Sequence, residues 1–268
     1  MLRLGLPKSA PVVAICALAV LASACSSNSA SPATTAKSST SGTGIPTQSV
    51  DSAIAATVPQ AIKSKGSLVI ALDATYAPDE FIAADGKTII GMDADLAKAI
   101  TQVLGLKATL VNATFDTIIP GLQSGKYDMG DSSFTDTLAR QKVVDFVTYF
   151  QAGEGFYVKS GNPGFNGLDS LCGHSVAVED GTTEQSDAQT QAKTCTKDGK
   201  ATVTVLSYGN QSQANLAVSG GRAEVGFADS QVAAYIVATS NGVYTKILTK
   251  WGVQAGAVST ATINSATS

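Results

Sequence analysis

The chain of 268 residues is poor in the residues on which most catalytic and metal sites depend. It contains one histidine, four cysteines and one tryptophan, and 15% of its residues are charged. The histidine, His174, has no partner visible in the sequence, so no Ser–His–acid triad is indicated. Neither a phosphate-binding loop nor a metal-ligand spacing occurs. These absences rank hydrolases, nucleotidases and metalloenzymes low, and no metal or cofactor is expected.

Long apolar runs and clusters of positive charge are also missing. The apolar run at residues 11–21 is too short to span a bilayer. After residue 24 the chain has 16 basic and 21 acidic residues, a net charge near minus five. No basic run is interleaved with aromatic residues, which argues against nucleic acid as a partner.

The first 24 residues have the three parts of an export signal. Arg3 and Lys8 precede the apolar run, and small residues lead to Cys25. Residues 21–25, Leu-Ala-Ser-Ala-Cys, resemble a bacterial lipobox, with alanine in place of the usual leucine three positions before the cysteine. Cleavage before Cys25 predicts a lipid-anchored, extracytoplasmic protein on the outer face of the cytoplasmic membrane. Ordinary secretory cleavage near Ala24 is the alternative.

Export also bears on the remaining cysteines. Cys16 and Cys25 belong to the signal, which leaves Cys172 and Cys195 in the folded part. In an oxidising compartment the natural interpretation is a disulfide between them. Such a bond closes a loop of 24 residues and should contribute on the order of 3 kcal/mol.

Composition and hydrophobic patterns divide the rest of the chain. Of the 25 residues from Ser26 to Val50, 13 are Ser or Thr, which predicts a flexible tether. The expected segments are a tether over 25–60, lobe one over 61–154, lobe two over 155–238, a C-terminal helix returning to lobe one over 239–255, and a tail over 256–268.

Within the two expected lobes, strand and helix patterns alternate. The sequence predicts strands at 67–72, 107–111, 127–133, 175–178, 203–206 and 224–227, and helices at 93–104, from 116, at 183–193 and at 211–218. An extended segment at 155–159 joins the two series. This rhythm predicts a right-handed parallel α/β unit in each lobe. A last helix pattern runs through Tyr244, Ile247, Leu248 and Trp251.

Several short motifs follow one another in a characteristic order. They lie at residues 73–76, 91–96, 115–122, 132–136 with 140, 144–146, 181–183, 229, 241–244 and 250–252. In order and spacing they resemble the bacterial extracellular solute-binding protein family 3, the substrate-binding lipoproteins of polar amino acid ABC transporters. The resemblance implies a two-lobed α/β clamp, like type II periplasmic binding proteins, with a parallel-type sheet in each lobe.

The resemblance also implies which residues hold the two charged groups of an amino acid. Arg140 and the helix opening at Thr182 and Thr183 match the grip on the ligand carboxylate, since a guanidinium and free backbone N–H groups both bind anions. Asp229 matches the partner of the ammonium group. A carbonyl and a hydroxyl from lobe one are supplied by Ser133 and Thr135.

Four further positions match the surroundings of the ligand side chain. Tyr76 and Phe115 correspond to aromatic residues on either side of it. Asp73 and Glu179 correspond to residues at its far end, where two carboxylates favour a ligand such as arginine, lysine, histidine or glutamine. Taken singly, these residues also have ordinary structural interpretations: a surface cation for Arg140, helix caps for the threonines and Asp229, and core packing for the aromatics.

One block of the family pattern is shortened in this chain. Residues 232–239 run almost directly into Asn241, where members carry a further strand and a second crossing strand. The resemblance therefore implies that lobe two loses an edge strand and that the hinge has one regular strand. A degenerate lipoprotein that binds nothing is one alternative function. The other is a dehydratase-like enzyme, for which Glu179 is the residue available as a general acid.

The expected partners follow from the same resemblance. They are an amino acid ligand, the permease of an ABC importer with its intracellular ATPase, and the membrane through a lipid anchor. A monomer without enzymatic activity is expected.

Overall fold

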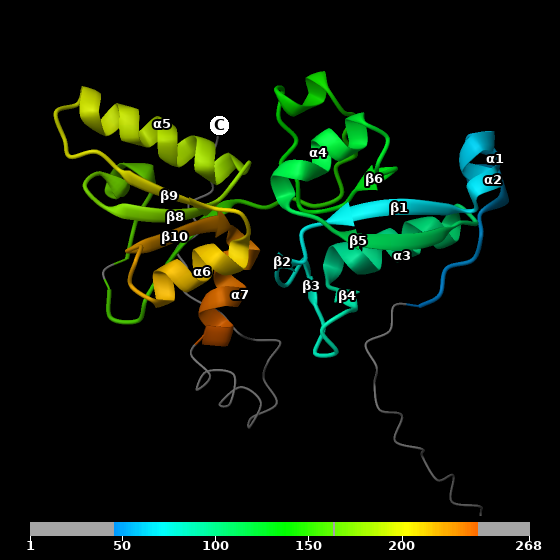
Figure 1. Ribbon diagram of the computed structural model, residues 1–268, viewed down its shortest axis with the longest axis horizontal. Coiled ribbons are helices and arrows are strands. Elements are labelled where there is room, and N and C mark those ends of the chain that lie inside the picture. The colour runs from blue at the N-terminus through cyan, green and yellow to red at the C-terminus, as the bar shows by residue number, and fades with distance from the viewer. Residues whose placement is uncertain (1–45, 163, 241–268) are drawn as a thin grey trace, which may run out of the picture. The chain divides into compact units, whose positions relative to one another are not determined.

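The computed structural model describes residues 46–162 and 164–240 (Figure 1). The predicted export signal, Cys25 and the C-terminal helix through Trp251 lie outside these residues. Within the described ranges, no helix is both long and apolar enough to cross a bilayer.

Two short helices, α1 (Ser52–Thr57) and α2 (Gln60–Lys65), lie on either side of the expected boundary between the flexible tether and lobe one. The carboxylate of Asp51 accepts hydrogen bonds from the backbone N–H groups of Ala53 and Ile54, at 2.9 and 3.0 Å. The N–H of Asp51 donates to the carbonyl of Val103 at 3.0 Å. This capping fixes a helix start at Ser52, within the segment 25–60 that was expected to be a flexible tether.

Lobe one contains the predicted parallel sheet with a helix on each face. Its strand order is β5-β1-β6, with helices α3 and α4 between them in sequence. On β1, Ile70 and Leu72 pack in one apolar cluster with α3, whereas Ala71 packs with Ile118 of α4 on the opposite face. The bounds are β1 Ser67–Leu72, α3 Met92–Val103, β5 Lys107–Asn112, α4 Phe115–Gln123 and β6 Met129–Gly130.

Two features of lobe one differ from the sequence prediction. The third strand was expected over 127–133 but pairs with β1 only through Met129 and Gly130. A small antiparallel sheet that the patterns did not predict is formed by β2 (Thr75–Tyr76), β3 (Glu80–Ile82) and β4 (Ile89–Ile90). Its strands are too short to show an alternating pattern.

Lobe two has the strand order β7-β10-β8-β9, in which β8, β9 and β10 are parallel and β7 is antiparallel to β10. Val176 and Phe227 pack with α5 on one face, whereas Ala177 and Ala228 pack with α6 and α7 on the other. The bounds are β7 Glu154–Val158, β8 Ser175–Glu179, α5 Thr183–Lys197, β9 Thr204–Tyr208, α6 Gln211–Ser219, β10 Val225–Asp229 and α7 Ser230–Ser240.

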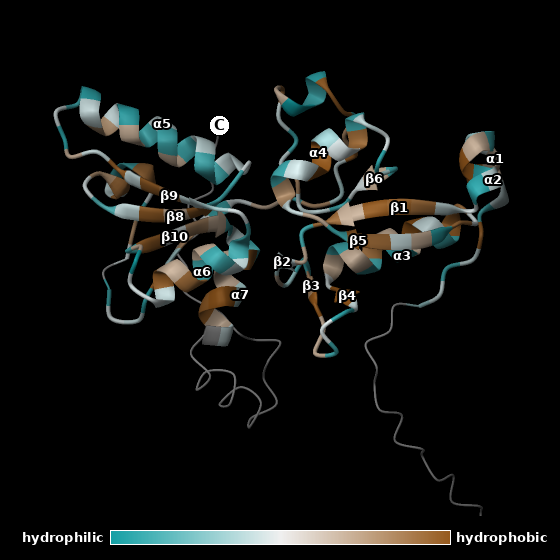
Figure 2. Cartoon of the chain, in the orientation of Figure 1, coloured by the Kyte–Doolittle hydropathy of each residue, from teal (hydrophilic) through white to brown (hydrophobic). Residues whose placement is uncertain are grey.

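The two outer layers of lobe two differ in polarity. Figure 2 draws α5 largely in the hydrophilic colour and α7 largely in the hydrophobic one. Helix α7 follows β10 directly, and the shortened block expected after residue 239 lies outside the described residues. In the strand order of the described residues, β7 is an edge strand of the sheet.

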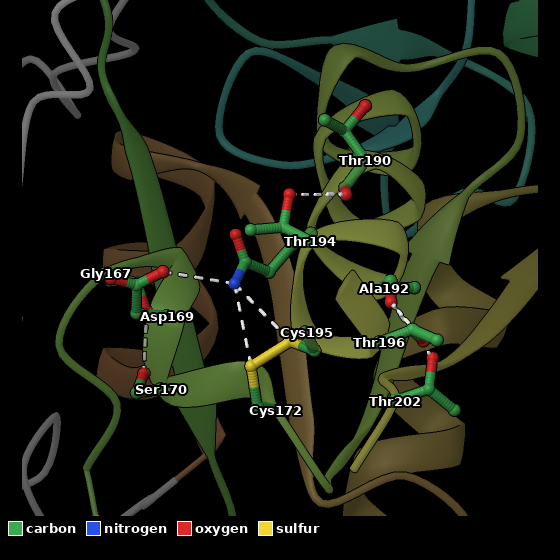
Figure 3. The surroundings of a disulfide bond; sticks show 11 residues. Gly167, Asp169, Ser170, Cys172, Thr190, Ala192, Thr194, Cys195, Thr196 and Thr202 are labelled. Carbon is green, nitrogen blue, oxygen red and sulfur yellow. Dashed lines mark hydrogen bonds between the residues drawn. A yellow bond between two sulfur atoms is a disulfide. The ribbon is translucent and has the colours of Figure 1, made fainter. Parts of the chain in front are cut away.

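The predicted disulfide between Cys172 and Cys195 is present (Figure 3). It joins the end of the short 3₁₀ helix η2 (Leu168–Leu171) to the last part of α5. The side-chain amide of Gln191 donates to Asp169 at 3.1 Å and lies 3.4 Å from the sulfur of Cys195. The bond thus fixes α5 to the segment that precedes β8.

Removal of this disulfide should destabilise the protein. The double substitution Cys172→Ser and Cys195→Ser releases the loop in the unfolded chain and should lower the free energy of unfolding by about 3 kcal/mol. Urea denaturation measures the change. Addition of a reductant should destabilise the natural protein but leave the double variant unchanged, which is the control. Equal urea midpoints for the oxidised natural protein and the variant would contradict the prediction.

Candidate functional site

A small cavity lies where strands of the lobe-two sheet end and face residues of lobe one. Strands β8 and β10 end at Glu179 and Asp229, and parallel α/β sheets bind ligands at this edge. Its volume of about 10 Å³ has room for roughly one water molecule. The cavity is lined by Tyr76, Phe115, Ser133, Thr135, Arg140, Glu179, Thr182, Thr183, Glu184 and Asp229.

Nine of the ten ligand-binding residues predicted from the sequence are in this lining. They come from seven separate points along the chain, so the fold itself brings them together. Asp73 is the predicted residue that does not line the cavity.

Arg140 lies in the short 3₁₀ helix η1 (Arg140–Lys142) and reaches across the cavity. Its two terminal nitrogens donate to the carbonyls of Thr135 and Gly181, at 2.8 and 2.9 Å. The guanidinium carbon lies 5.4 Å from the centre of the Phe115 ring and 5.2 Å from that of Phe134. The two rings stack with centres 4.1 Å apart. This aromatic support orients the guanidinium, so Arg140 is more than a solvated surface cation.

The first turn of α5 forms another side of the cavity. Thr182 is the N-cap, and its hydroxyl accepts a hydrogen bond from the N–H of Gln185 at 3.1 Å. The hydroxyl of Thr183 lies 3.3 Å from that of Thr135 in lobe one. Thr182 is therefore a helix cap, as its ordinary interpretation held. The first turn still presents backbone N–H groups and the positive end of the helix dipole to an anion.

Asp229 pairs with Tyr76 across the cavity. The Tyr76 hydroxyl donates to the Asp229 carboxylate at 3.1 Å, and the hydroxyl oxygen of Tyr76 accepts a hydrogen bond from the backbone N–H of Asp229, also at 3.1 Å. Burial, followed by the nearby charge of Glu184, raises the pKa of Asp229 to about 8. A cationic partner would favour the ionised carboxylate and lower this pKa.

Glu179 is the most enclosed carboxylate of the lining, with 1% of its surface exposed. In the described part of the chain, neither of its oxygens has a hydrogen-bond partner. Burial and the neighbouring charge of Asp73 raise the pKa of Glu179 to about 10. A carboxyl group that is buried without a partner is costly, and a ligand with hydrogen-bond donors would offset that cost.

Asp73 lies behind the cavity and holds backbone and side-chain groups of lobe one, and its place at the far end of the ligand stays a prediction. One carboxylate oxygen accepts hydrogen bonds from the N–H and hydroxyl of Thr75, at 3.1 and 2.6 Å. The other accepts the N–H of Phe115 at 3.0 Å, at the start of α4. Asp73 also acts on the cavity through Glu179, because its charge and the close approach of the two carboxyl groups raise the pKa of Glu179.

The backbone at Ser133 is in the left-handed region, with φ of 47°. This conformation costs a residue other than glycine roughly 1–2 kcal/mol. The Ser133 N–H donates to Asp93 at 2.9 Å, and its hydroxyl donates to Asp79 at 2.9 Å. These buried acids hold the turn that places Ser133 and Thr135 at the cavity, a pattern of backbone strain common at functional sites.

Glu184 lines the cavity but was not predicted from the sequence. It is 3% exposed, and one of its carboxylate oxygens lacks a hydrogen-bond partner among the described residues. An acidic residue in the first turn of a helix usually serves the helix dipole, so its sequence position gave no separate signal. Its pKa is raised by burial, whereas the charge of Arg140 lowers it.

The charges of the lining are unequal. Glu179, Glu184 and Asp229 stand against one cation, Arg140. The described residues contain no group of three His, Cys, Asp or Glu placed to hold a metal ion. The site therefore matches an organic solute that has one anionic group and more than one cationic or donor group.

Two α/β lobes with a small polar cavity lined from both define the class of two-lobed solute-binding proteins. The sequence pattern of the bacterial extracellular solute-binding proteins, family 3, matches residues 68–254. The chain belongs to this family, as the order of its motifs indicated.

Relatives within the family include proteins named for arginine. The chain is 34% identical over 190 residues to the arginine-binding protein ArgT of Corynebacterium glutamicum, an alignment that covers 70% of this chain and 62% of the relative. The chain thus spans less than two thirds of the length of that curated relative.

Solved structures of similar fold also bind amino acids. An ancestral arginine-binding protein bound to arginine is 37% identical, with a TM-score of 0.59 over 66% of this chain and 75% of that one. The ancestral amino acid-binding protein AncCDT-1, a precursor of cyclohexadienyl dehydratase, is 31% identical, with a TM-score of 0.61 over 72% and 94%.

Proposed function

We propose that this protein is the extracytoplasmic substrate-binding lipoprotein of an ABC importer and that it binds a basic amino acid between its lobes. Lipidation at Cys25 holds it on the outer face of the cytoplasmic membrane. It delivers the ligand to a membrane permease whose ATPase lies inside the cell, and it acts as a monomer without enzymatic activity. The relatives named for arginine support this assignment.

The observation that carries the proposal is the unpaired carboxyl group of Glu179 at a cavity with three acids and one base. The guanidinium of arginine offers a flat fork of N–H donors that fits a carboxylate with two hydrogen bonds. A ligand of this kind supplies both missing partners of Glu179 at once. A neutral apolar side chain would leave the buried carboxyl group unpaired.

The remaining groups account for the main-chain part of an amino acid. Its carboxylate binds to Arg140 and the first turn of α5, and its ammonium group binds to Asp229 and Glu184. Because these residues belong to both lobes, the ligand stabilises the arrangement in which they face each other.

A small-molecule pocket usually measures roughly 300–1,000 Å³. The present cavity is far smaller, so entry of the ligand requires its lining to move apart.

Calorimetric titration of the purified mature protein with each of the twenty amino acids tests the proposal. Binding of arginine or lysine in preference to alanine or glutamate supports it. Preferential binding of a neutral or acidic amino acid contradicts the assignment of Glu179. No heat from a protein shown to be folded by circular dichroism would indicate a degenerate clamp instead.

The proposed lipid anchor has its own test. The substitution Cys25→Ser removes the thiol that would carry the lipid and should move the protein from the membrane fraction to the soluble fraction of the cell envelope. Immunoblotting of the two fractions measures the change. Cys16→Ser, within the predicted signal, is the matched control and should leave the protein on the membrane. An unchanged distribution for Cys25→Ser contradicts lipidation there.

A dehydratase-like enzyme is the second candidate, and one observation favours it. A carboxyl group with a pKa of about 10, such as Glu179, is protonated at neutral pH and can act as a general acid. The structural similarity to a precursor of a dehydratase points the same way. Incubation with arogenate or prephenate, followed by product analysis, separates the candidates. Turnover that is lost in Glu179→Gln would establish the enzyme.

A further inference from the structure

A second and much larger cavity lies away from the acidic site. It is a groove of about 1310 Å³ bordered by β3, β7, α6 and α7. Apolar side chains form much of its wall, among them Phe81, Phe165, Leu216, Tyr235, Ile236 and Val237. Leu216 remains 63% exposed there. An exposed apolar surface of this kind commonly marks a docking site.

Two of the three lobe-two elements that border the groove, α7 and β7, are incompletely covered by the described residues. Helix α7 is apolar almost throughout, in the sequence Ser-Gln-Val-Ala-Ala-Tyr-Ile-Val-Ala-Thr-Ser, and helices of this kind are normally buried on all sides. Strand β7 pairs with β10 along one side only, among the described residues. Exposed strand edges are usually covered in natural proteins. The described residues therefore leave the groove open to an occupant.

We propose that the C-terminal segment of this same chain, residues 241–268, docks in the groove. Residues 235–239, the last described turn of α7 before Ser240, themselves line the groove. The next residues of the chain thus begin at its wall. The segment has apolar side chains at Val243, Tyr244, Ile247, Leu248 and Trp251. This spacing predicts a helix with one apolar face, which would complement an apolar groove.

Tethering favours this occupant over a second copy or another protein. A segment joined directly to its docking site has an effective concentration on the order of millimolar, far above that of a free partner. The segment of 28 residues is long enough to follow the groove and turn within it. Docking would cover α7 and shield the side of β7 that pairs with no described strand, where the resemblance implies that a strand is missing.

Trp251 provides a direct probe, because it is the only tryptophan of the chain. Its fluorescence emission should be blue-shifted in the folded mature protein relative to the urea-unfolded chain, and poorly quenched by iodide. Leu216→Asp places a charge in the groove and should move the emission most of the way to the unfolded value and raise the quenching constant severalfold. Ile236→Asp should act in the same way.

Leu138→Asp is the matched control, since Leu138 is 79% exposed and lies outside the groove. It should leave the Trp251 emission unchanged. Circular dichroism checks that each variant is folded, and Leu216→Ser replaces Leu216→Asp if the charge prevents folding. Three results overturn the proposal: a solvent-exposed Trp251 in the folded protein, a blue shift that neither groove variant alters, or a blue shift that disappears on dilution and so reports a second copy.

Discussion

Replacement of Arg140 by alanine should weaken binding of the amino acid ligand by about 2 to 5 kcal/mol, roughly thirtyfold to several-thousandfold in the dissociation constant. The guanidinium stands over Phe115 and Phe134 and has one nitrogen directed to each lobe, at Thr135 and Gly181. Without this guanidinium, only the first turn of α5 would bind the ligand carboxylate. The three acids of the lining would then lack a cationic partner. Calorimetric titration of the variant measures the effect.

Two controls make this result specific to Arg140. Arg222→Ala removes one positive charge from an exposed position of lobe two and should leave the dissociation constant within a factor of about two, as surface charge changes usually do. Arg140→Lys keeps the charge but loses the two-pronged geometry, so its binding should fall between that of the natural protein and that of Arg140→Ala. An unchanged dissociation constant in a folded Arg140→Ala protein removes Arg140 from the site.

Substitution of Glu179 by glutamine should change stability and binding in opposite directions. The pKa of Glu179 in the folded, unliganded protein is about 10, against an ordinary value of 4.5. For an acid whose pKa is raised by folding, stability is highest below the unfolded pKa and is lost as the pH rises toward the folded pKa. At pH 8 the natural protein must take up a proton at Glu179 on folding, which glutamine does not require, so the variant should be more stable by about 2 kcal/mol or more.

Binding of arginine should depend on pH in the opposite direction to stability. An ionised Glu179 is the form that pairs with a guanidinium, so arginine binding releases a proton and should strengthen from pH 6 to pH 8. Glu179→Gln should bind arginine more weakly and lose much of this pH dependence. Titrations in two buffers of different ionisation enthalpy count the protons released. Asp145→Asn, which removes one exposed carboxylate of the chain, is the control and should change neither quantity. Equal proton release by the natural protein and Glu179→Gln contradicts the role of Glu179.

The regular elements of both lobes could be predicted because their patterns are local. Strand β1 has the bounds expected for it, and α3 and α5 begin within one residue of their predicted starts. The sheet of β2, β3 and β4 could not be predicted, since its strands have two or three residues each and depend on contacts with one another. The same holds for β6, whose length is set by how far it pairs with β1.

The candidate site likewise contains residues that local sequence patterns predict and residues that depend on distant contacts. Arg140 and Asp229 were predicted because they stand in motifs, and the structure places both at one cavity. The position of Asp73 depends on the N–H of Phe115, a partner 42 residues away that no local pattern reveals. Glu184 was missed because a first-turn acid is common in helices of every kind. Its place at the cavity follows from the packing of α5 against the sheet.

The disulfide restrains one end of α5 while the other end faces the cavity. A helix of 15 residues is about 22 Å long and moves largely as a rigid rod. Because Cys195 fixes its last turns to the segment before β8, the N–H groups of its first turn keep their direction before any ligand arrives. Association then loses less conformational entropy. The disulfide thus preorganises the end of lobe two proposed to bind the ligand carboxylate, so that one covalent bond restrains a surface at the opposite end of the helix.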